Sequence, residues 1–92
     1  MSDYFEGFVT KVFDGDTVEI DTVRFKRTNG YNYKDIERVR LVGFDAPELN
    51  APGGKAARDR LARRVLGKYV RVYVTARDVF GRVLGRLELA AA

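Results

Sequence analysis

The sequence predicts a mainly β domain of the α+β class, with five strands and one α-helix between the third and fourth strands. Short runs of aromatic and β-branched residues recur along the chain, and turn residues separate them. One segment instead has apolar residues at helical spacing. A chain of 92 residues can bury one core, so residues 1–92 are expected to form a single domain.

The first three strands are predicted from these runs. Residues Tyr4–Phe13 and Thr17–Ile20 flank an Asp-Gly pair, which is typical of a tight hairpin turn. The polar segment Arg24–Glu37 then carries several basic residues between aromatic ones, and it predicts a long basic hairpin tip. Residues Arg38–Phe44 alternate again and predict the third strand.

The second half of the chain contains the helix and the last two strands. Both prolines lie between Asp45 and Gly54, which predicts a loop. Residues Lys55–Leu66 place apolar side chains on one face and four arginines outside it, as an amphipathic helix does. Residues Tyr69–Thr75 and Val83–Leu89 predict strands on either side of a glycine-containing turn.

This order of three strands, a helix and two strands fits a five-stranded Greek-key barrel with the helix at one end, the OB-fold. An open α+β sheet with the same order is the alternative. Periodicity alone does not distinguish them, because it does not show whether the sheet closes.

The amino-acid composition excludes several kinds of functional site and favours one kind of partner. The chain has no cysteine and no histidine, which excludes disulfides, thiolate or imidazole metal sites and a histidine general base, so any metal must be bound by oxygen. Seventeen Lys and Arg against thirteen Asp and Glu give a charge of +4, which favours a polyanionic partner. No apolar run approaches the length of about 20 residues that a membrane helix needs, so no membrane partner is expected.

Two acidic segments follow strands and can converge in the fold. Calcium binds six to eight oxygens, so Asp16, Asp45 and the Ala46 carbonyl, which the next proline holds in a fixed direction, are candidate metal ligands. Glu48 can accept a proton from an attacking water. The alternative is that these residues only shape turns and loops.

Two arginines are candidates for binding phosphate. Arg40 precedes the Asp45 loop and Arg82 follows the last turn, and planar guanidinium groups match the charge of a phosphoryl transition state. An arginine taken singly is more often a surface or ion-pairing residue, and that is the alternative for each of them.

Taken together, these positions resemble the staphylococcal nuclease (thermonuclease) family. The family pattern has five elements in order, and the chain contains all of them: an Asp-Gly-Asp-Thr turn at 14–17, an arginine at 40, an Asp-x-Pro-Glu loop at 45–48, a helix at 55–66 and an Asp-x-(Tyr/Phe)-Gly-Arg turn at 78–82.

The resemblance implies an OB barrel that cleaves DNA and RNA on the 5′ side of the phosphodiester and leaves 3′-phosphate ends. It implies a Ca²⁺ site formed by Asp16, Asp45 and the Ala46 carbonyl. It also implies that Glu48 activates or orients water and that Arg40 and Arg82 bind the phosphate and stabilise the pentacoordinate state.

The chain also departs from the family pattern. Val79 replaces the basic residue that the family often has before the aromatic of the last turn, whereas Phe80 keeps a ring for stacking. The chain resembles a short form without the C-terminal helices that cover the barrel in free nucleases, so we expect a homodimer or higher oligomer through the uncovered surface. The alternative is that Leu87 and Leu89 close the barrel end in a monomer.

The basic tip is a second candidate nucleic-acid surface. Tyr31, Tyr33 and Lys34 combine rings with positive charge, as a surface that binds single strands does. The alternative is that the tyrosines pack on the hairpin itself. For the chain as a whole, a calcium-dependent nuclease acting on DNA or RNA is preferred over a non-catalytic nucleic-acid-binding OB module or a fragment of a larger nuclease.

Overall fold

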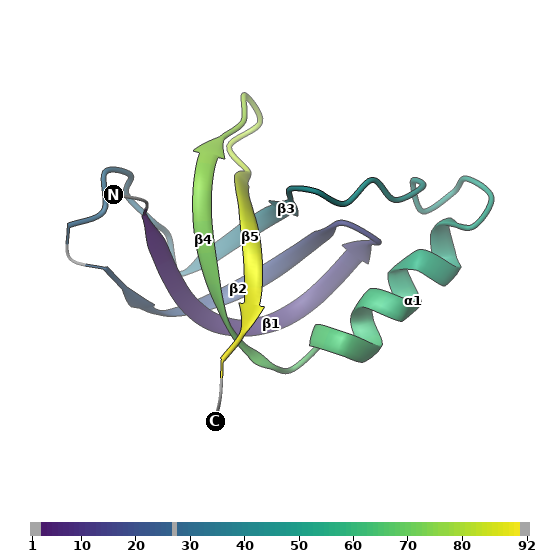
Figure 1. Cartoon of the computed structure of the whole chain (residues 1–92), viewed down its shortest axis with the longest axis horizontal. Helices are drawn as coiled ribbons and strands as arrows, with labels where there is room; N and C mark the ends of the chain where they lie inside the picture. Colours follow the sequence, from purple (N-terminus) through teal and green to yellow (C-terminus); the bar gives the residue numbers. More distant parts are fainter. Residues whose placement is uncertain (1–2, 27, 91–92) are drawn as a thin grey trace.

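The computed structural model describes residues 3–26 and 28–90. Five strands form a closed barrel in the order β1-β2-β3-β5-β4, with one helix between β3 and β4 (Figure 1). The closed barrel confirms the OB-fold prediction and rules out the open sheet. The elements are β1 (Tyr4–Asp14), β2 (Thr17–Phe25), β3 (Ile36–Leu41), α1 (Gly54–Val65), β4 (Tyr69–Arg77) and β5 (Val83–Leu89).

The barrel closes because β1 pairs with strands on both of its edges. Its first half pairs with β4 and its whole length pairs with β2, and register shifts along the β1–β2 pair allow the strand to bend. One of these shifts lies at Gly7, where a Cβ atom would collide with the carbonyl oxygen of Asp21. Strands β3 and β5 complete the circle through a parallel pairing.

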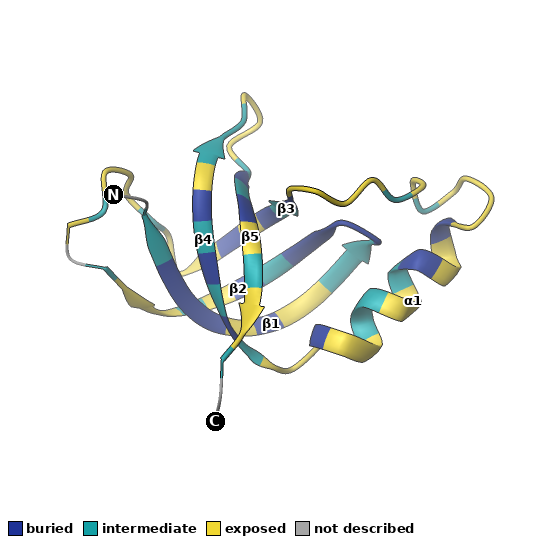
Figure 2. Cartoon of the chain, viewed as in Figure 1, coloured by how far each residue is buried: buried dark blue, intermediate teal, exposed yellow. Residues whose placement is uncertain are grey.

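Every strand has buried residues (Figure 2), and strands β3 and β4 alternate most clearly between buried and less buried positions. Buried side chains from all five strands form the core. Valines predominate in this core because β-branched side chains suit a pleated, buried surface. The core cluster consists of Phe5, Val9, Val18, Ile20, Val39, Leu41, Val65, Val70, Val72, Val74 and Val83.

Several element boundaries differ from the predicted ones. The β1–β2 turn is at Gly15 and Asp16, one residue later than the Asp-Gly pair suggests. Strand β3 ends at Leu41 rather than Phe44, because Gly43 has a φ of 82° that an extended strand does not allow. Phe44 is therefore a loop residue, and its side chain is exposed.

Helix α1 lies beside β1 and next to the β1–β2 turn (Figure 1). Gly15 makes this approach close, since a Cβ atom there would lie 2.5 Å from the Ala46 Cβ and 2.8 Å from the Ala57 Cβ. The turn, the loop that follows β3 and the helix therefore meet at one end of the barrel. In the described part of the chain, no helix has the length and apolar character that crossing a bilayer requires.

The expected homodimer requires exposed apolar side chains, and the last strand and the β4–β5 turn provide some. Leu87 packs against the core, whereas Leu89 is exposed, as are Val79 and Phe80 in the β4–β5 turn. Apolar side chains are thus available for association, and the homodimer stays a prediction.

A buried carboxylate on β1 gives the fold a pH dependence. Arg71 Nε donates to Glu6 Oε2 at 2.7 Å and the Tyr69 hydroxyl donates to Oε1 at 3.0 Å. Burial raises the pKa of Glu6, but these hydrogen bonds more than offset it and hold the pKa below the usual 4.5. A carboxyl group with a lowered pKa stabilises the folded state above its unfolded pKa and loses that contribution as the pH falls through its folded pKa.

The free energy of unfolding is therefore expected to fall as the pH drops below about 4.5, and Glu6→Gln should flatten this dependence. Urea unfolding at pH 7, 5 and 3 measures it. The same pH dependence in the wild type and in Glu6→Gln would contradict the assignment.

Candidate active site

The β1–β2 turn holds Asp16 in a buried position. The Asp16 amide donates to Asp14 Oδ1 at 3.0 Å, as in a tight turn that an aspartate side chain closes. The Thr17 hydroxyl donates to Asp16 Oδ1 at 3.1 Å, and the Leu41 amide donates to the Asp16 carbonyl at 2.7 Å. The carboxylate of Asp16 is thereby fixed against the end of β3.

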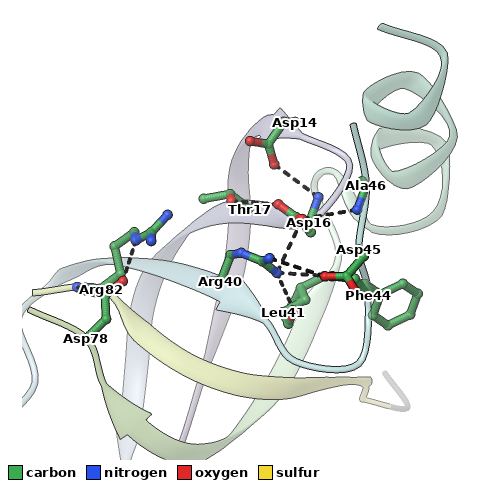
Figure 3. A network of polar contacts seen from close by, with 10 residues as sticks. All are labelled: Asp14, Asp16, Thr17, Arg40, Leu41, Phe44, Asp45, Ala46, Asp78 and Arg82. Atoms are coloured by element: carbon green, nitrogen blue, oxygen red, sulfur yellow. Dashed lines mark hydrogen bonds and ion pairs between the residues drawn. The ribbon is translucent and has the colours of Figure 1, made fainter. Parts of the chain in front are cut away.

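Arg40 joins the two acidic segments (Figure 3). Residues Thr17 and Arg40 are register partners in the β2–β3 pair, so the arginine lies beside the turn. Its Nη1 is 3.2 Å from Asp16 Oδ2 and its Nη2 is 3.7 Å from Asp45 Oδ1. Nη1 also donates to the carbonyls of Leu41 at 2.9 Å and Phe44 at 3.1 Å, which holds the loop after β3 against the barrel.

The two predicted metal-ligating carboxylates differ in exposure. Asp16 is 6% exposed, and burial raises its pKa above the usual range, with a further contribution from the neighbouring Asp14 carboxyl. Asp45 is fully exposed. The amide of Ala46 donates to Asp16 Oδ2 at 3.3 Å, so the backbone of this third predicted ligand lies beside the same carboxylate.

The β4–β5 turn positions Arg82 near this cluster. Asp78 accepts hydrogen bonds from the amides of Phe80 and Arg82, and its Oδ2 accepts one from Arg82 Nε at 2.7 Å. The Arg82 side chain is therefore held at Nε. The Phe80 ring, 81% exposed, lies 5.7 Å from its guanidinium carbon.

An open groove of about 450 Å³ connects these parts, and we call it the first groove. Its lining includes Arg40, Asp45, Asp78, Phe80 and Arg82. Both predicted phosphate-binding arginines thus face one space, although each is also ion-paired, Arg40 with Asp16 and Asp45, and Arg82 with Asp78.

Glu48 is less closely associated with the groove. It is an exposed loop residue and does not line the first groove, and its carbonyl accepts a hydrogen bond from the Ala51 amide. The structure therefore brings together Asp16, Asp45, Ala46 and Arg40, and it leaves Glu48 outside this cluster of contacts. Among residues 3–26 and 28–90, no group of three or more acidic, histidine or cysteine side chains gathers as a metal site.

The tip residues have different environments. Tyr33 packs 5.0 Å from Phe5 between ring centroids, and its hydroxyl donates to Asp3 Oδ2 at 2.7 Å, so this ring lies on the hairpin and core. Tyr31 and Lys34 are exposed. The tip lies at the opposite end of the molecule's long axis from α1 (Figure 1).

Tyr31→Ala is expected to weaken the binding of a single-stranded oligonucleotide by about 1 to 3 kcal/mol, the value of one stacked base. Tyr31→Phe keeps the ring and should keep the affinity. Fluorescence anisotropy with a labelled oligothymidylate measures both variants, and an unchanged dissociation constant in Tyr31→Ala with an intact fold would reject the tip as a binding surface.

Two residues that organise the groove were not assigned from the sequence. Asp78 belongs to the predicted last turn, but its role in orienting Arg82 was not assigned, although the spacing of four residues between opposite charges is a usable signal. Arg77 binds Glu37 Oε2 at 2.7 Å and the carbonyls of Gly81 and Asn32, which ties the last turn to the tip. No local pattern indicates the contacts with Asn32 and Glu37, because these partners are 45 and 40 residues away in the sequence.

Comparison with known proteins agrees with this geometry. The family model described as "Staphylococcal nuclease homologue" matches residues 38–91. The chain is 36% identical over 81 residues, 88% of its length, to an "Uncharacterized endonuclease" of Escherichia coli, of which it covers 46%. It is 48% identical over 48 residues, 52% of its length, to the "Probable staphylococcal-like nuclease CAN2" of Oryza sativa subsp. japonica, of which it covers 13%.

A third relative, "Protein ParB" of Escherichia coli, is 36% identical over 89 residues, which are 92% of this chain and 45% of that protein. The chain thus spans less than half the length of each of these three relatives. The family model nevertheless matches more than half of the chain, over the segment that contains Arg40, Asp45, Asp78 and Arg82. The chain therefore belongs to the staphylococcal nuclease homologue family.

Proposed function

We propose that this domain is a calcium-dependent nuclease that hydrolyses phosphodiester bonds of DNA or RNA. The observation that carries the proposal is the convergence of the Asp16 and Asp45 carboxylates on Arg40, in a groove that Arg82 also lines. Opposite charges of this kind suit a phosphodiester, because the arginines attract the phosphate and the carboxylates attract a cation that neutralises it.

The donor set fits a hard cation. Carboxylate and carbonyl oxygens are the ligands that calcium prefers, and the Asp16 and Asp45 carboxylates and the Ala46 backbone lie close together around Arg40. Asp16, Asp45 and the Ala46 carbonyl would hold the ion, with water and a phosphate oxygen completing its shell. When bound, calcium supplies Lewis-acid polarisation of the phosphoryl oxygen.

The protein's own groups have distinct roles in this proposal. Arg82, fixed through Nε by Asp78, presents its remaining nitrogens to a non-bridging oxygen, on which negative charge builds up during phosphoryl transfer. Arg40 lines the same groove and adds positive charge there, while its Nη1 keeps the Phe44 carbonyl and the loop in place. Glu48 accepts the proton of the attacking water, which requires the 45–53 loop to bring it towards the groove.

Phe80 offers its exposed face to a base next to the cleaved bond.

The carboxylates and arginines together favour a catalytic domain over an OB module that only binds nucleic acid, because in such a module the acidic groups would only repel the substrate. Because the chain covers less than half of its relatives, a fragment of a larger nuclease remains the second candidate.

A cleavage assay tests the proposal. Single-stranded DNA, duplex DNA and RNA are incubated with the protein in CaCl₂ or in EDTA, and the product ends are identified by mass spectrometry. We expect cleavage in calcium alone, with 3′-phosphate products. Cleavage that continues unchanged in EDTA would reject the metal assignment, and intact substrate with bound protein in calcium would favour the binding-only module.

A further inference from the structure

A second groove, of about 280 Å³, lies between α1 and the loop after β3. The second groove exists because Gly15 lets α1 and the loop approach the β1–β2 turn from two sides. Its apolar lining includes Phe44, Pro47 and Leu61. Phe44 is 53% exposed, so a flat ring faces solvent at the edge of this groove.

Two arginines give the second groove its charge. Arg60 and Arg64 both line it, and both are exposed. They lie four residues apart, about 6 Å along the helix axis, and so share one helix face. Like charges at this spacing destabilise a helix, and no ion pair joins either arginine to a carboxylate in the described ranges. On the same helix, Arg58 is paired with Asp59 at 3.1 Å.

The second groove adjoins the first. Phe44 and Asp45 line both, so the two grooves meet at this pair of residues. The Asp45 carboxylate is directed towards Arg40, at 3.7 Å, and not towards the helix arginines. A chain of repeating phosphates that leaves the first groove across Phe44 therefore enters a space with two available guanidinium groups.

We propose that the second groove binds the nucleotide of the substrate strand adjacent to the cleaved bond. The base lies on the apolar lining beside Phe44, and Arg60 and Arg64 bind the backbone phosphate. A free acidic peptide fits less well, because it lacks a flat apolar group at each anionic unit. The inference rests on the proposed function, since it takes the first groove as the cleavage site.

The double variant Arg60→Gln/Arg64→Gln tests this inference, with Arg63→Gln as the matched control. Arg63 is an exposed arginine of the same helix that does not line either groove. Binding of a fluorescein-labelled twelve-nucleotide oligothymidylate is measured by anisotropy in EDTA at several salt concentrations. Glutamine preserves helix propensity, so thermal unfolding should confirm that both variants fold.

The double variant should raise the dissociation constant by roughly tenfold at low salt. It should also reduce the magnitude of the salt slope by about 0.7, the contribution of the one backbone phosphate that the two arginines no longer neutralise. Arg63→Gln should change the dissociation constant by less than about twofold. Equal constants and slopes in the double variant and the control would overturn the assignment. This experiment measures binding without cleavage. Its failure is therefore distinct from a failure of the proposed function, which would be seen as an absence of cleavage in calcium.

Discussion

Arg82→Lys is expected to lower the cleavage rate by about 100-fold or more, the cost of removing one donor that stabilises transition-state charge. In the folded protein, Asp78 holds Arg82 at Nε, which leaves the two terminal nitrogens for phosphate. A lysine ammonium is a single point charge and does not bind Asp78 and a phosphate in the same fixed geometry. Single-turnover cleavage of a labelled single strand measures this effect.

Arg86→Lys is the matched control. Arg86 lies on β5, the strand that follows Arg82, is exposed, and pairs with Glu88 at 3.5 Å. This variant should cleave within about twofold of the wild-type rate, since surface ion pairs contribute little. A wild-type cleavage rate in Arg82→Lys would show that Arg82 does not stabilise the transition state and that its ion pair with Asp78 has only a structural role.

Asp16→Asn is expected to abolish cleavage while leaving the protein folded. Asparagine has nearly the shape of aspartate and can accept the Thr17 hydroxyl hydrogen bond, but it lacks the negative charge that a calcium ligand supplies. The free energy of unfolding is expected to fall by no more than about 1 to 3 kcal/mol, because the variant loses the Arg40 ion pair and the Ala46 hydrogen bond at Oδ2 but also loses a buried charge next to the Asp14 carboxyl.

Asp21→Asn on the exposed face of β2 removes the same charge away from the site and should retain activity. Cleavage assays and urea unfolding of both variants make the comparison. An Asp16→Asn protein that is fully active would place the catalytic metal elsewhere. An inactive protein that is also unfolded would show that Asp16 has a structural role in the turn.

The sequence is sufficient to predict the barrel because its strands follow simple alternation. In β4, Val70, Val72 and Val74 are buried, as the period of two requires. The end of β3 was predicted too late, since Val42 and Phe44 look like strand residues and only the positive φ of Gly43 between them ends the extended conformation. The alternation of apolar and polar residues does not reveal such a change in backbone conformation.

The sequence predicted which residues form the candidate site where these residues lie at or next to the ends of strands. Asp16, Arg40 and Asp45 meet because the register of β2 and β3 places Thr17 beside Arg40, and the motif spacing reflects that register. The second groove could not be predicted, because it depends on how α1 docks against Gly15. Packing of Tyr33 on the hairpin was one of the two alternatives from the sequence, but its partners Phe5 and Asp3 could not be identified, since they are about thirty residues away.

The dependence of the cleavage rate on calcium concentration, compared between the wild type and Asp45→Asn, tests most directly whether the two carboxylates hold a catalytic metal. Asp45 is exposed, so its replacement leaves the core untouched, and it supplies one of the two carboxylate ligands in the proposed site. If Asp16 and Asp45 hold the ion, calcium should activate the wild type in a saturable way, and the half-saturating calcium concentration should be clearly higher in the variant. Identical calcium curves for the two proteins, or a rate that does not depend on calcium, would contradict this assignment.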